Sequence, residues 1–298
     1  MYNSASIMFM HSITSLHVGS GTSVSTVDLP IQREKFTNFP VVAGSGVKGA
    51  IREYFEKSED KKHVEIIFGP EKDGSDFAGA VSFSDAKILL FPVKSLKGVF
   101  AWVTCPMVIE RFNRDMKIVN PAFSALALPG TDKDSATVGT SSDCIIERKV
   151  ILEDYELALN DKNNKEVDRI AETIAGYIFK NATAYWADKL KKSLIVLNDD
   201  AFKEFVEYST EIQTRIKIGE NGVVENGALF YEENIPAETV FYSVVLASNP
   251  HKKDFTEEIS DSGRILGVIG KLDGRFIHIG GDTTIGKGLT AVYLTGGK

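Results

Sequence analysis

The chain has 298 residues, of which 43% are hydrophobic and 25% charged, a balance typical of a globular protein. No apolar run approaches the roughly 20 residues of a membrane-spanning helix, so we expect no membrane partner. The net charge of −7 argues against binding nucleic acid through overall charge, because phosphate contacts come from Lys and Arg. Segments 28–52 and 264–288 nevertheless contain more basic than acidic residues, which leaves a local basic groove possible.

The N-terminus lacks the basic start and small-residue cleavage site of a signal peptide, so none is expected. The two cysteines, Cys105 and Cys144, lie far apart and in no metal-ligand spacing. This usage argues against a disulfide framework and against a structural zinc site. We therefore expect a cytoplasmic protein.

The first half of the chain predicts an α+β fold. Alternating apolar residues predict a half-buried strand over 5–16, and a long loop rich in Gly, Ser and Thr follows over 17–44. Ser45 is predicted to cap a helix over 46–57. Two strands follow, over 80–91 and 99–105, joined by a turn over 92–98, and a helix starts at Pro106. This β-α-β-β-α order predicts a ferredoxin-like (RRM-like) fold, with an antiparallel sheet under two helices.

Residues 118–210 break this pattern and predict an insertion or second lobe within a single domain of residues 1–298. Its elements are expected to be a mobile polar loop over 129–143, a strand over 149–159, and helices over 164–180 and 199–208. After it we expect strands over 213–218 and 239–247 joined by a glycine-containing excursion, a helix over 254–271, and strands over 276–279 and 289–294.

The segment AGSGVKGAIREYF, residues 43–55, opens a helix with glycine and serine. Free backbone amides at a helix start attract anions. Lys48 and Arg52 are four residues apart and therefore lie on one helix face. The pattern predicts a phosphate cradle, although an ordinary glycine-rich helix start with solvated cations explains it equally well.

The segment IGGDTTIGKGLT, residues 279–290, has four glycines that allow a ligand to approach the backbone, and Lys287 adds a cation. It matches neither the Walker loop nor the dinucleotide fingerprint, so a plain glycine hairpin is the alternative. The loop of residues 17–36 combines His17 and Asp28 with Arg33. A carboxylate beside cations can bind a divalent ion or take a proton from a sugar hydroxyl, or it can simply form a turn.

The segment ENGALFYEENIPAE, residues 225–238, places the aromatic residues Phe230 and Tyr231 beside the acidic residues Glu232 and Glu233. Aromatic faces stack on unpaired bases, so this excursion is a candidate wedge against RNA. The alternative is a hairpin whose aromatic residues pack into the core.

Together these segments resemble the repeated backbone subunit of type III-B (Cmr) CRISPR effector complexes, in the RAMP superfamily. The residues that carry the resemblance are HVGSGTSVSTVDLPIQRE (17–34), FPVVAGSGVKGAIR (39–52), IFGP (67–70), DAKILLFPVKSLKGVFAWVT (85–104), STEIQTRIKI (209–218), ALFYEENIP (228–236) and IHIGGDTTIGKGL (277–289). Each is weak alone, but all occur in the order found in the family.

The resemblance implies a ferredoxin-like palm with insertions and a thumb hairpin, which we assign to residues 218–236. It implies further copies of the chain stacked as a helical filament on guide RNA (crRNA), together with other Cmr subunits. Target RNA paired with the guide would be cleaved at regular intervals by its own 2′-hydroxyl, in a reaction that depends on a divalent metal ion, Mg²⁺ or Mn²⁺.

The resemblance also assigns roles to residues. Asp28 corresponds to the catalytic acid, as metal ligand or base, and His17 would assist proton transfer. Glu232 would complete the site, where Asn234 replaces an expected aromatic residue. The residues expected to contact RNA are Arg33, Ser45, Lys48, Arg52, Phe230, Tyr231, Gly280, Gly281 and Lys287.

Three other functions stay open at this point. A binding-only scaffold would space guide and target without cutting. A stand-alone RAMP endoribonuclease would process guide precursors as a free protein. A metal-free nucleotide-binding protein would use the glycine loops alone.

Overall fold

A computed structural model describes residues 2–24, 26–71, 77–180, 182–218, 224–252 and 254–295, with 224–228 described by their backbone alone. Within these residues thirteen strands join in one mixed sheet, and two further strands form a separate hairpin. The strands of the large sheet are β1 (Ser4–Ser12), β2 (Val41–Val42), β3 (Val81–Phe83), β4 (Ala86–Lys94), β5 (Phe100–Thr104), β6 (Ser135–Val138), β7 (Ile145–Ile146), β8 (Lys149–Leu152), β9 (Tyr155–Asn160), β10 (Leu194–Val196), β13 (Val240–Ala247), β14 (Arg275–His278) and β15 (Leu289–Leu294).

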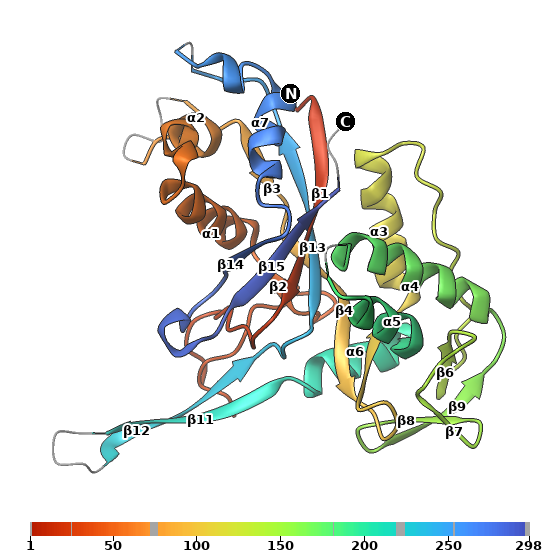
Figure 1. Cartoon of the computed structure of the whole chain (residues 1–298). Coiled ribbons are helices and arrows are strands. Elements are labelled where there is room, and N and C mark those ends of the chain that lie inside the picture. Colours follow the sequence, from red (N-terminus) through yellow and green to blue (C-terminus); the bar gives the residue numbers. More distant parts are fainter. Residues whose placement is uncertain are drawn as a thin grey trace.

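Helices cover both faces of this sheet (Figure 1). They are α1 (Gly44–Glu56), α2 (Val64–Phe68), α3 (Pro106–Val119), α4 (Asn164–Ile178), α5 (Ala184–Ser193), α6 (Asp199–Tyr208) and α7 (Ser262–Gly270), with short 3-10 turns η1 (Glu59–His63), η2 (Glu257–Ile259) and η3 (Thr283–Ile285). Helices α1 and α7 lie on one side of the central strands, and α3 and α4 lie on the other (Figure 1). Among the described helices, none combines the length and hydrophobicity that a membrane crossing requires.

Strand β1 is the centre of the fold. It pairs antiparallel with β13 on one side and with β15 on the other, so that Phe9 lies opposite both Tyr242 and Tyr293. The strand was expected to be half-buried, but it is buried on both faces from Ser6 to Ser12. The reason is that α7 packs on one face and α3 and α4 pack on the other.

The start of α1 differs from the sequence prediction. The helix begins at Gly44 after the N-cap Ala43, so Ser45 lies in the first turn and is not the cap. The amide of Gly44 donates to Asp85 Oδ1 at 2.7 Å, and the amide of Ala43 donates to the side-chain oxygen of Gln32 at 3.1 Å. A side chain at position 44 would clash, because its Cβ would lie 2.5 Å from the carbonyl oxygen of Phe83. A carboxylate therefore occupies part of the expected anion site.

Asp85 also explains why the single strand expected over 80–91 is divided into β3 and β4. The break falls at Ser84 and Asp85, where the Ser84 hydroxyl accepts from the amide of Val244 at 2.9 Å. The two strands pair with opposite ends of β13. The break turns the Asp85 side chain toward the first turn of α1, where it caps that helix.

The second half of the sheet corrects two predictions about residues 118–210. Residues 135–138, expected within a mobile loop, form β6, which is buried between β10 and β9. The strand expected over 149–159 is the hairpin of β8 and β9, which turns at Glu153 with a positive φ of 49°. The small polar residues of β6 are typical of a turn by composition, but they fit between closely packed layers.

Among the remaining elements, two helices match the prediction, a helix and a strand were not predicted, and one helix is shorter than predicted. Helices α4 and α6 match the two helices predicted over 164–180 and 199–208. The sequence pattern missed α5 and β10, although β10 joins the two halves of the sheet by pairing with β5. The helix expected over 254–271 is shorter, because α7 begins after the N-cap Asp261, whose carboxylate accepts from the amide of Arg264 at 2.9 Å.

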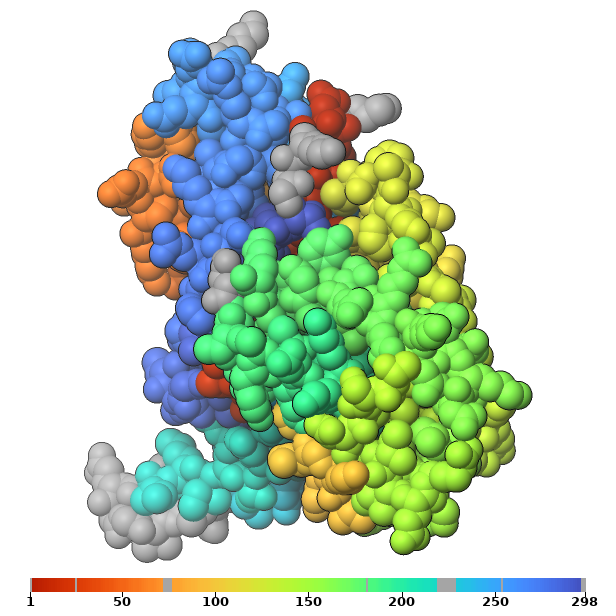
Figure 2. Space-filling view, turned by 45° about the vertical axis from the view of Figure 1, so that its right-hand side comes forward, coloured from red at the N-terminus to blue at the C-terminus, as the bar shows by residue number. Residues whose placement is uncertain are grey.

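The separate hairpin consists of β11 (Glu211–Ile218) and β12 (Val224–Asn234). It extends beyond the body of the molecule (Figures 1 and 2). The excursion expected over 218–236 is therefore the second part of a hairpin that already begins at Glu211. Residues 219–223 lie outside the described residues. One face of the hairpin carries exposed apolar side chains, namely Ile212, Ile216, Ile218, Leu229 and Tyr231.

We predict that the missed strand β10 is essential to the core. Ile195 is fully buried there, so Ile195→Ala should lower the free energy of unfolding by about 2–5 kcal/mol, measured by urea denaturation. Ile118→Ala is the matched control at an exposed position on α3 and should change it by less than about 0.5 kcal/mol. Equal effects of the two variants would contradict the core position of β10.

Candidate functional site

The loop of residues 17–36 is fastened to strand β12. The amide of Leu29 donates to the carbonyl of Tyr231 at 3.0 Å, and the amide of Glu233 donates back to the carbonyl of Leu29 at 3.0 Å. Leu16 and Ile235 form a further bridge at the base of the loop. The loop therefore takes its position from β12 and moves with it.

Asp28 and His17 both lie against this strand. The Asp28 carboxylate is partly exposed, and its Oδ2 accepts from the amide of Tyr231 at 2.8 Å. His17 Nδ1 lies 2.7 Å from the carbonyl oxygen of Glu233. Because a carbonyl only accepts, Nδ1 must donate, which leaves Nε2 of the neutral ring as an acceptor. The two candidate catalytic side chains are thus held by backbone groups two residues apart on β12.

Glu232 does not have the environment of a reactive carboxylate. It is 1% exposed, and its two oxygens form ion pairs with Lys287 and Arg215. Burial alone would raise its pKa, but hydrogen bonds from Lys287 and Arg215 outweigh burial and lower the pKa from 4.5 to about 2. The ionised Glu232 therefore stabilises the folded state fully above pH 4.5, and this contribution is lost as the pH falls toward 2. In this structure Glu232 is a buried ion-pair partner, and its role in completing the catalytic site stays a prediction.

Lys287 is the partner of this anchor and is 6% exposed. Its Nζ also donates to the side-chain oxygen of Asn234 at 2.8 Å. Asn234 occupies the position where the family resemblance called for an aromatic residue, and here it supplies a hydrogen-bond acceptor to the lysine. Lys287 was expected to contact guide phosphates, but it cannot do so without breaking a buried ion pair.

Arg33 is also occupied within the protein. Its side chain is 14% exposed, and Nη2 pairs with Glu233 Oε1 at 2.6 Å. Nη1 donates to the carbonyl oxygens of Asn38 and Val206, each at 2.9 Å. The other carboxylate oxygen of Glu233 accepts from the amide of Ile31 at 3.0 Å. Arg33 therefore joins the loop of residues 17–36 to β12 and to α6, and the RNA contact expected of it stays a prediction.

Phe230 and Tyr231 are divided between the two faces of the hairpin, as successive residues of a strand must be. The ring of Phe230 lies under the guanidinium of Arg215, 5.6 Å from ring centroid to Cζ. The Tyr231 side chain is exposed on the other face, and its backbone amide donates to the Asp28 carboxylate. The two aromatic residues thus cannot line a single cleft, and Tyr231 is the one that lies beside the candidate catalytic carboxylate.

Arg215 was missed by sequence reasoning. Its Nη1 bridges Glu232 and Asp282, with 2.7 Å to Asp282 Oδ2, and so links the hairpin to the glycine loop. The available signal was the period-two pattern of β11. Glu211, Gln213, Arg215 and Lys217 alternate there with Ile212, Thr214, Ile216 and Ile218, which predicts a polar face that was not singled out.

The glycine loop of residues 279–288 packs against His17. Gly280 has a φ of 81°, and a Cβ there would lie 2.3 Å from the carbonyl oxygen of His17. The amide of Gly281 donates to the same oxygen at 2.9 Å. These glycines are required because two segments of the protein pack closely, and this packing places the glycine loop beside the loop of residues 17–36.

The candidate guide-binding residues of α1 form a separate group. Ser45 and Lys48 border a pocket of about 450 Å³ together with Gly69, and burial, then Arg52, lowers the pKa of Lys48. Arg52 pairs with Glu56 at 2.7 Å and donates to the carbonyl of Gly69 at 3.0 Å. The structure therefore keeps Ser45, Lys48 and Arg52 together, but apart from the cluster around Asp28.

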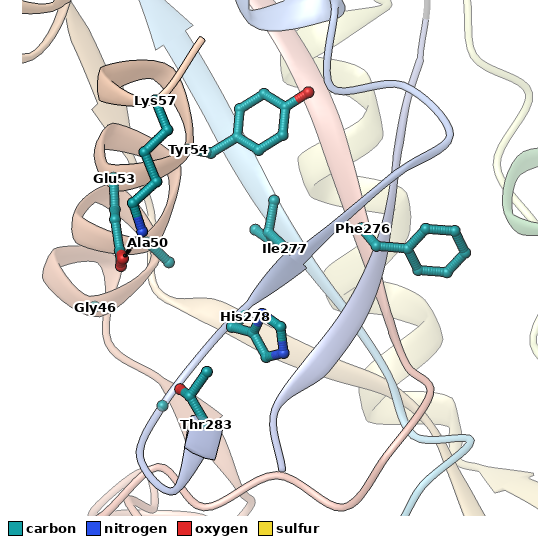
Figure 3. Close-up of a pocket in the computed structure, with 10 residues that line it drawn as sticks. Gly46, Ala50, Glu53, Tyr54, Lys57, Phe276, Ile277, His278 and Thr283 are labelled. Atoms are coloured by element: carbon teal, nitrogen blue, oxygen red, sulfur yellow. Dashed lines mark hydrogen bonds and ion pairs between the residues drawn. The ribbon is translucent and has the colours of Figure 1, made fainter. Parts of the chain in front are cut away.

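A larger pocket of about 600 Å³ lies between α1 and the edge strand β14 (Figure 3). On α1 the Lys57 and Glu53 side chains pair at 2.5 Å, and the opposite side is formed by β14 and the glycine loop. The sequence did not reveal this pocket, because its walls come from opposite ends of the chain. Its lining residues are Gly46, Ala50, Glu53, Tyr54, Lys57, Phe276, Ile277, His278, Gly280 and Thr283.

The described residues do not form a complete metal site. No three His, Cys, Asp or Glu side chains of the described ranges converge on a common point. Asp28 offers a single carboxylate, and Mg²⁺ in phosphate-handling sites commonly uses one or two carboxylates with substrate phosphates and water. The donor set fits a divalent cation only if RNA and water supply most of the ligands.

Comparison with known proteins identifies the family. A model of the RAMP superfamily matches residues 9–291. The chain belongs to the RAMP superfamily. It is 40% identical to the CRISPR system Cmr endoribonuclease Cmr4 of Pyrococcus furiosus, over 97% of this chain and 95% of that protein. It is 29% identical to the CRISPR system CMR subunit Cmr4 of Saccharolobus solfataricus, over 94% of this chain and 93% of that protein.

Solved structures of RAMP proteins have the same architecture. Oligomeric Cmr4 from Pyrococcus furiosus superposes with a TM-score of 0.76 at 33% identity, over 98% of both chains. A chain of the type III-B Cmr-beta complex bound to cognate target RNA superposes with a TM-score of 0.74 at 25% identity, again over 98% of both chains. The resemblance predicted from the sequence is confirmed, and so is a mixed α/β RAMP fold.

We predict that Lys287 stabilises the protein as a buried ion-pair partner. Lys287→Met should lower the free energy of unfolding at pH 7 by about 3–5 kcal/mol, because it removes a partner of the buried Glu232 carboxylate. Urea denaturation of the isolated chain measures this. Lys57→Met, in an exposed ion pair, is the control and should cost at most about 1 kcal/mol. A stable Lys287→Met protein with weakened RNA binding would instead make Lys287 an RNA ligand.

Proposed function

We propose that this chain is a guide-RNA-binding backbone subunit of a type III-B Cmr CRISPR complex and that it cleaves target RNA paired with the guide. The observation that carries the proposal is the position of Asp28. A partly exposed carboxylate is held by the backbone of a protruding hairpin, in a chain 40% identical to a Cmr endoribonuclease. The named relatives include a subunit of a complex bound to cognate target RNA, which supports RNA as the partner.

We also infer a ferredoxin-like palm. The sheet order β15-β1-β13-β4, with α1 following β1 and α7 joining β13 to β15, supports this assignment. Helices α1 and α7 cover the same face (Figure 1), as the two helices of such a fold do. Residues 118–210 are then an insertion within one domain of residues 1–298, and the β11–β12 hairpin is the thumb.

The proposed reaction uses the 2′-hydroxyl of the target RNA as nucleophile. In a stacked duplex this oxygen is not in line with the adjacent phosphorus and the 5′-oxygen leaving group, so a nucleotide must be displaced. Alignment and stabilisation of charge are then the main contributions of the protein. The products are a 2′,3′-cyclic phosphate and a 5′-hydroxyl.

Two side chains are placed to act on that nucleotide. Asp28 lies at the base of the thumb, where a displaced ribose would meet it, and accepts the 2′-hydroxyl proton directly or orients that hydroxyl. His17 is held by the carbonyl of Glu233 on the same strand and presents Nε2 as a second acceptor, and the leaving 5′-oxygen takes its proton from water. A divalent cation, Mg²⁺ or Mn²⁺, held by Asp28 with RNA oxygens and water, would neutralise charge at the phosphate.

Guide RNA is proposed to contact Ser45, Lys48 and Arg52 together with the exposed parts of the glycine loop. Such contacts to phosphate and sugar carry no sequence information, which suits a protein that must accept any guide. Base pairing then selects the target. Further copies of the chain, stacked as a filament on the guide in the cytoplasm, and other Cmr subunits are the expected partners. The oligomeric relative supports self-association.

We predict that the Asp28 carboxylate is required for cleavage but not for binding. In a reconstituted complex, Asp28→Asn should leave target affinity unchanged and slow cleavage by about 10²–10⁴-fold, because the amide cannot accept a proton yet still accepts from Tyr231. Gel assays of cleavage and filter binding measure the two quantities. Asp154→Asn, an exposed carboxylate at the β8–β9 turn, is the matched control. Undiminished cutting by the Asp28→Asn complex would leave the binding-only scaffold as the function.

The nucleophile is tested through the substrate. A single 2′-deoxy substitution on the nucleotide upstream of one scissile phosphate should abolish that cut and spare the others, since the attacking oxygen is missing only there. Sequencing-gel analysis of the products of a singly substituted target shows this. Persistent cutting at the substituted position would mean that water attacks the phosphate.

A further inference from the structure

The hairpin depends on its base for its orientation. Strands β11 and β12 form a two-stranded sheet of their own that extends from the body (Figure 2). An isolated hairpin is at best marginally stable in water, so contacts at its base must hold its angle to the palm. One set of contacts is made by side chains on the polar face of β12, and the other is made by the backbone along its outer edge.

On the polar face the contact is made by Arg215. Its Nη1 bridges Glu232 on the neighbouring strand and Asp282 in the glycine loop, 2.7 Å from Asp282 Oδ2. Asp282 has a left-handed φ of 61°, and its carbonyl accepts from the amides of Ile285 at 3.0 Å and Lys287 at 3.3 Å. The carboxylate that receives Arg215 is therefore part of a compact turn, and Arg215 fixes the hairpin to that turn.

Along the edge of β12 that does not pair with β11, the hairpin holds the loop of residues 17–36. The amide of Tyr231 donates to Asp28 Oδ2 at 2.8 Å, and Leu29 exchanges two backbone hydrogen bonds with Tyr231 and Glu233. Glu232, which pairs with Arg215, lies between these two residues in β12. A tilt of the hairpin base would therefore carry the Asp28 carboxylate with it.

We propose that Arg215 is a positioning residue for RNA cleavage. It fixes the base of the hairpin against Asp282 of the glycine loop, and through β12 it fixes where Asp28 meets the target nucleotide. This inference rests on the proposed function. The alternative for an arginine on an RNA-inserting hairpin is direct contact with a phosphate. The structure favours positioning, because two carboxylates share its Nη1 and the ring of Phe230 lies against its guanidinium.

Asp282 allows the two roles to be separated. Asp282→Asn keeps the shape of the side chain and removes the charge that holds Arg215. If Arg215 positions the hairpin, this change is as harmful to cleavage as the loss of the arginine. If Arg215 binds phosphate, the same change releases it for RNA and leaves cleavage intact or improves it.

The experiment uses reconstituted complexes carrying Arg215→Met, Asp282→Asn or both, with a guide-matched target RNA. We expect each single variant to slow single-turnover cleavage roughly 10- to 100-fold, as misplaced catalytic groups do. Target affinity and its dependence on salt should not change. The double variant should be no slower than the slower single variant, because both changes break one contact. Arg169→Met, an exposed arginine on α4, is the control and should cleave normally.

Several outcomes would overturn the inference. Arg215 would be a phosphate ligand if Asp282→Asn cleaved normally while Arg215→Met bound target RNA more weakly. In that case the slope of log affinity against log salt concentration would also fall by about one in Arg215→Met. Additive losses in the double variant would mean that the two residues act separately. If the complex that carries Arg215→Met fails to assemble, complexes that carry Asp282→Asn and Arg215→Lys allow the same comparison of cleavage and target binding. An Asp28→Asn complex measured in parallel separates the two proposals, since its undiminished cleavage overturns the proposed function itself.

Discussion

Two adjacent carboxylates on strand β12 hold the functional part of this molecule together. Glu232 and Glu233 point to opposite faces of the strand, and each is buried and paired with a cation from a distant segment, Lys287 and Arg33 respectively. An unpaired buried charge costs several kcal/mol, so neither loop can leave the hairpin without a large penalty. The loop of residues 17–36 and the glycine loop are therefore both anchored to the base of the hairpin.

Some Lys and Arg side chains of the candidate site are paired within the protein. Several cations that resemble RNA ligands in the sequence are engaged inside the protein, and Arg215 joins them through Asp282. The cations that stay near the surface of the candidate guide path are those of α1, above all Lys48. A protein with a net charge of −7 can therefore still offer a local positive region at Ser45, Lys48 and Arg52.

The central sheet and the hairpin are held in different ways. β1 is buried on both faces and pairs on both edges, so the central sheet forms a rigid base. The hairpin is joined to it through a few polar contacts and carries Asp28 against its backbone. In the proposed function this arrangement places the Asp28 carboxylate relative to the RNA that the hairpin would enter, which would suit a substrate that must be distorted before it reacts.

The sequence by itself determined the family, most helices and strands, and the segments around Asp28, His17 and the late glycines, because these follow from local periodicity and from residue order. It could not determine which charged side chains face RNA. Lys287 and Glu232 are 55 residues apart and are joined only when the chain folds. It also missed β6, whose small polar residues are typical of a turn, and β10, whose three apolar residues are too short a run to show a period. Burial and pairing are properties of contacts between distant residues, so only the tertiary structure decided them.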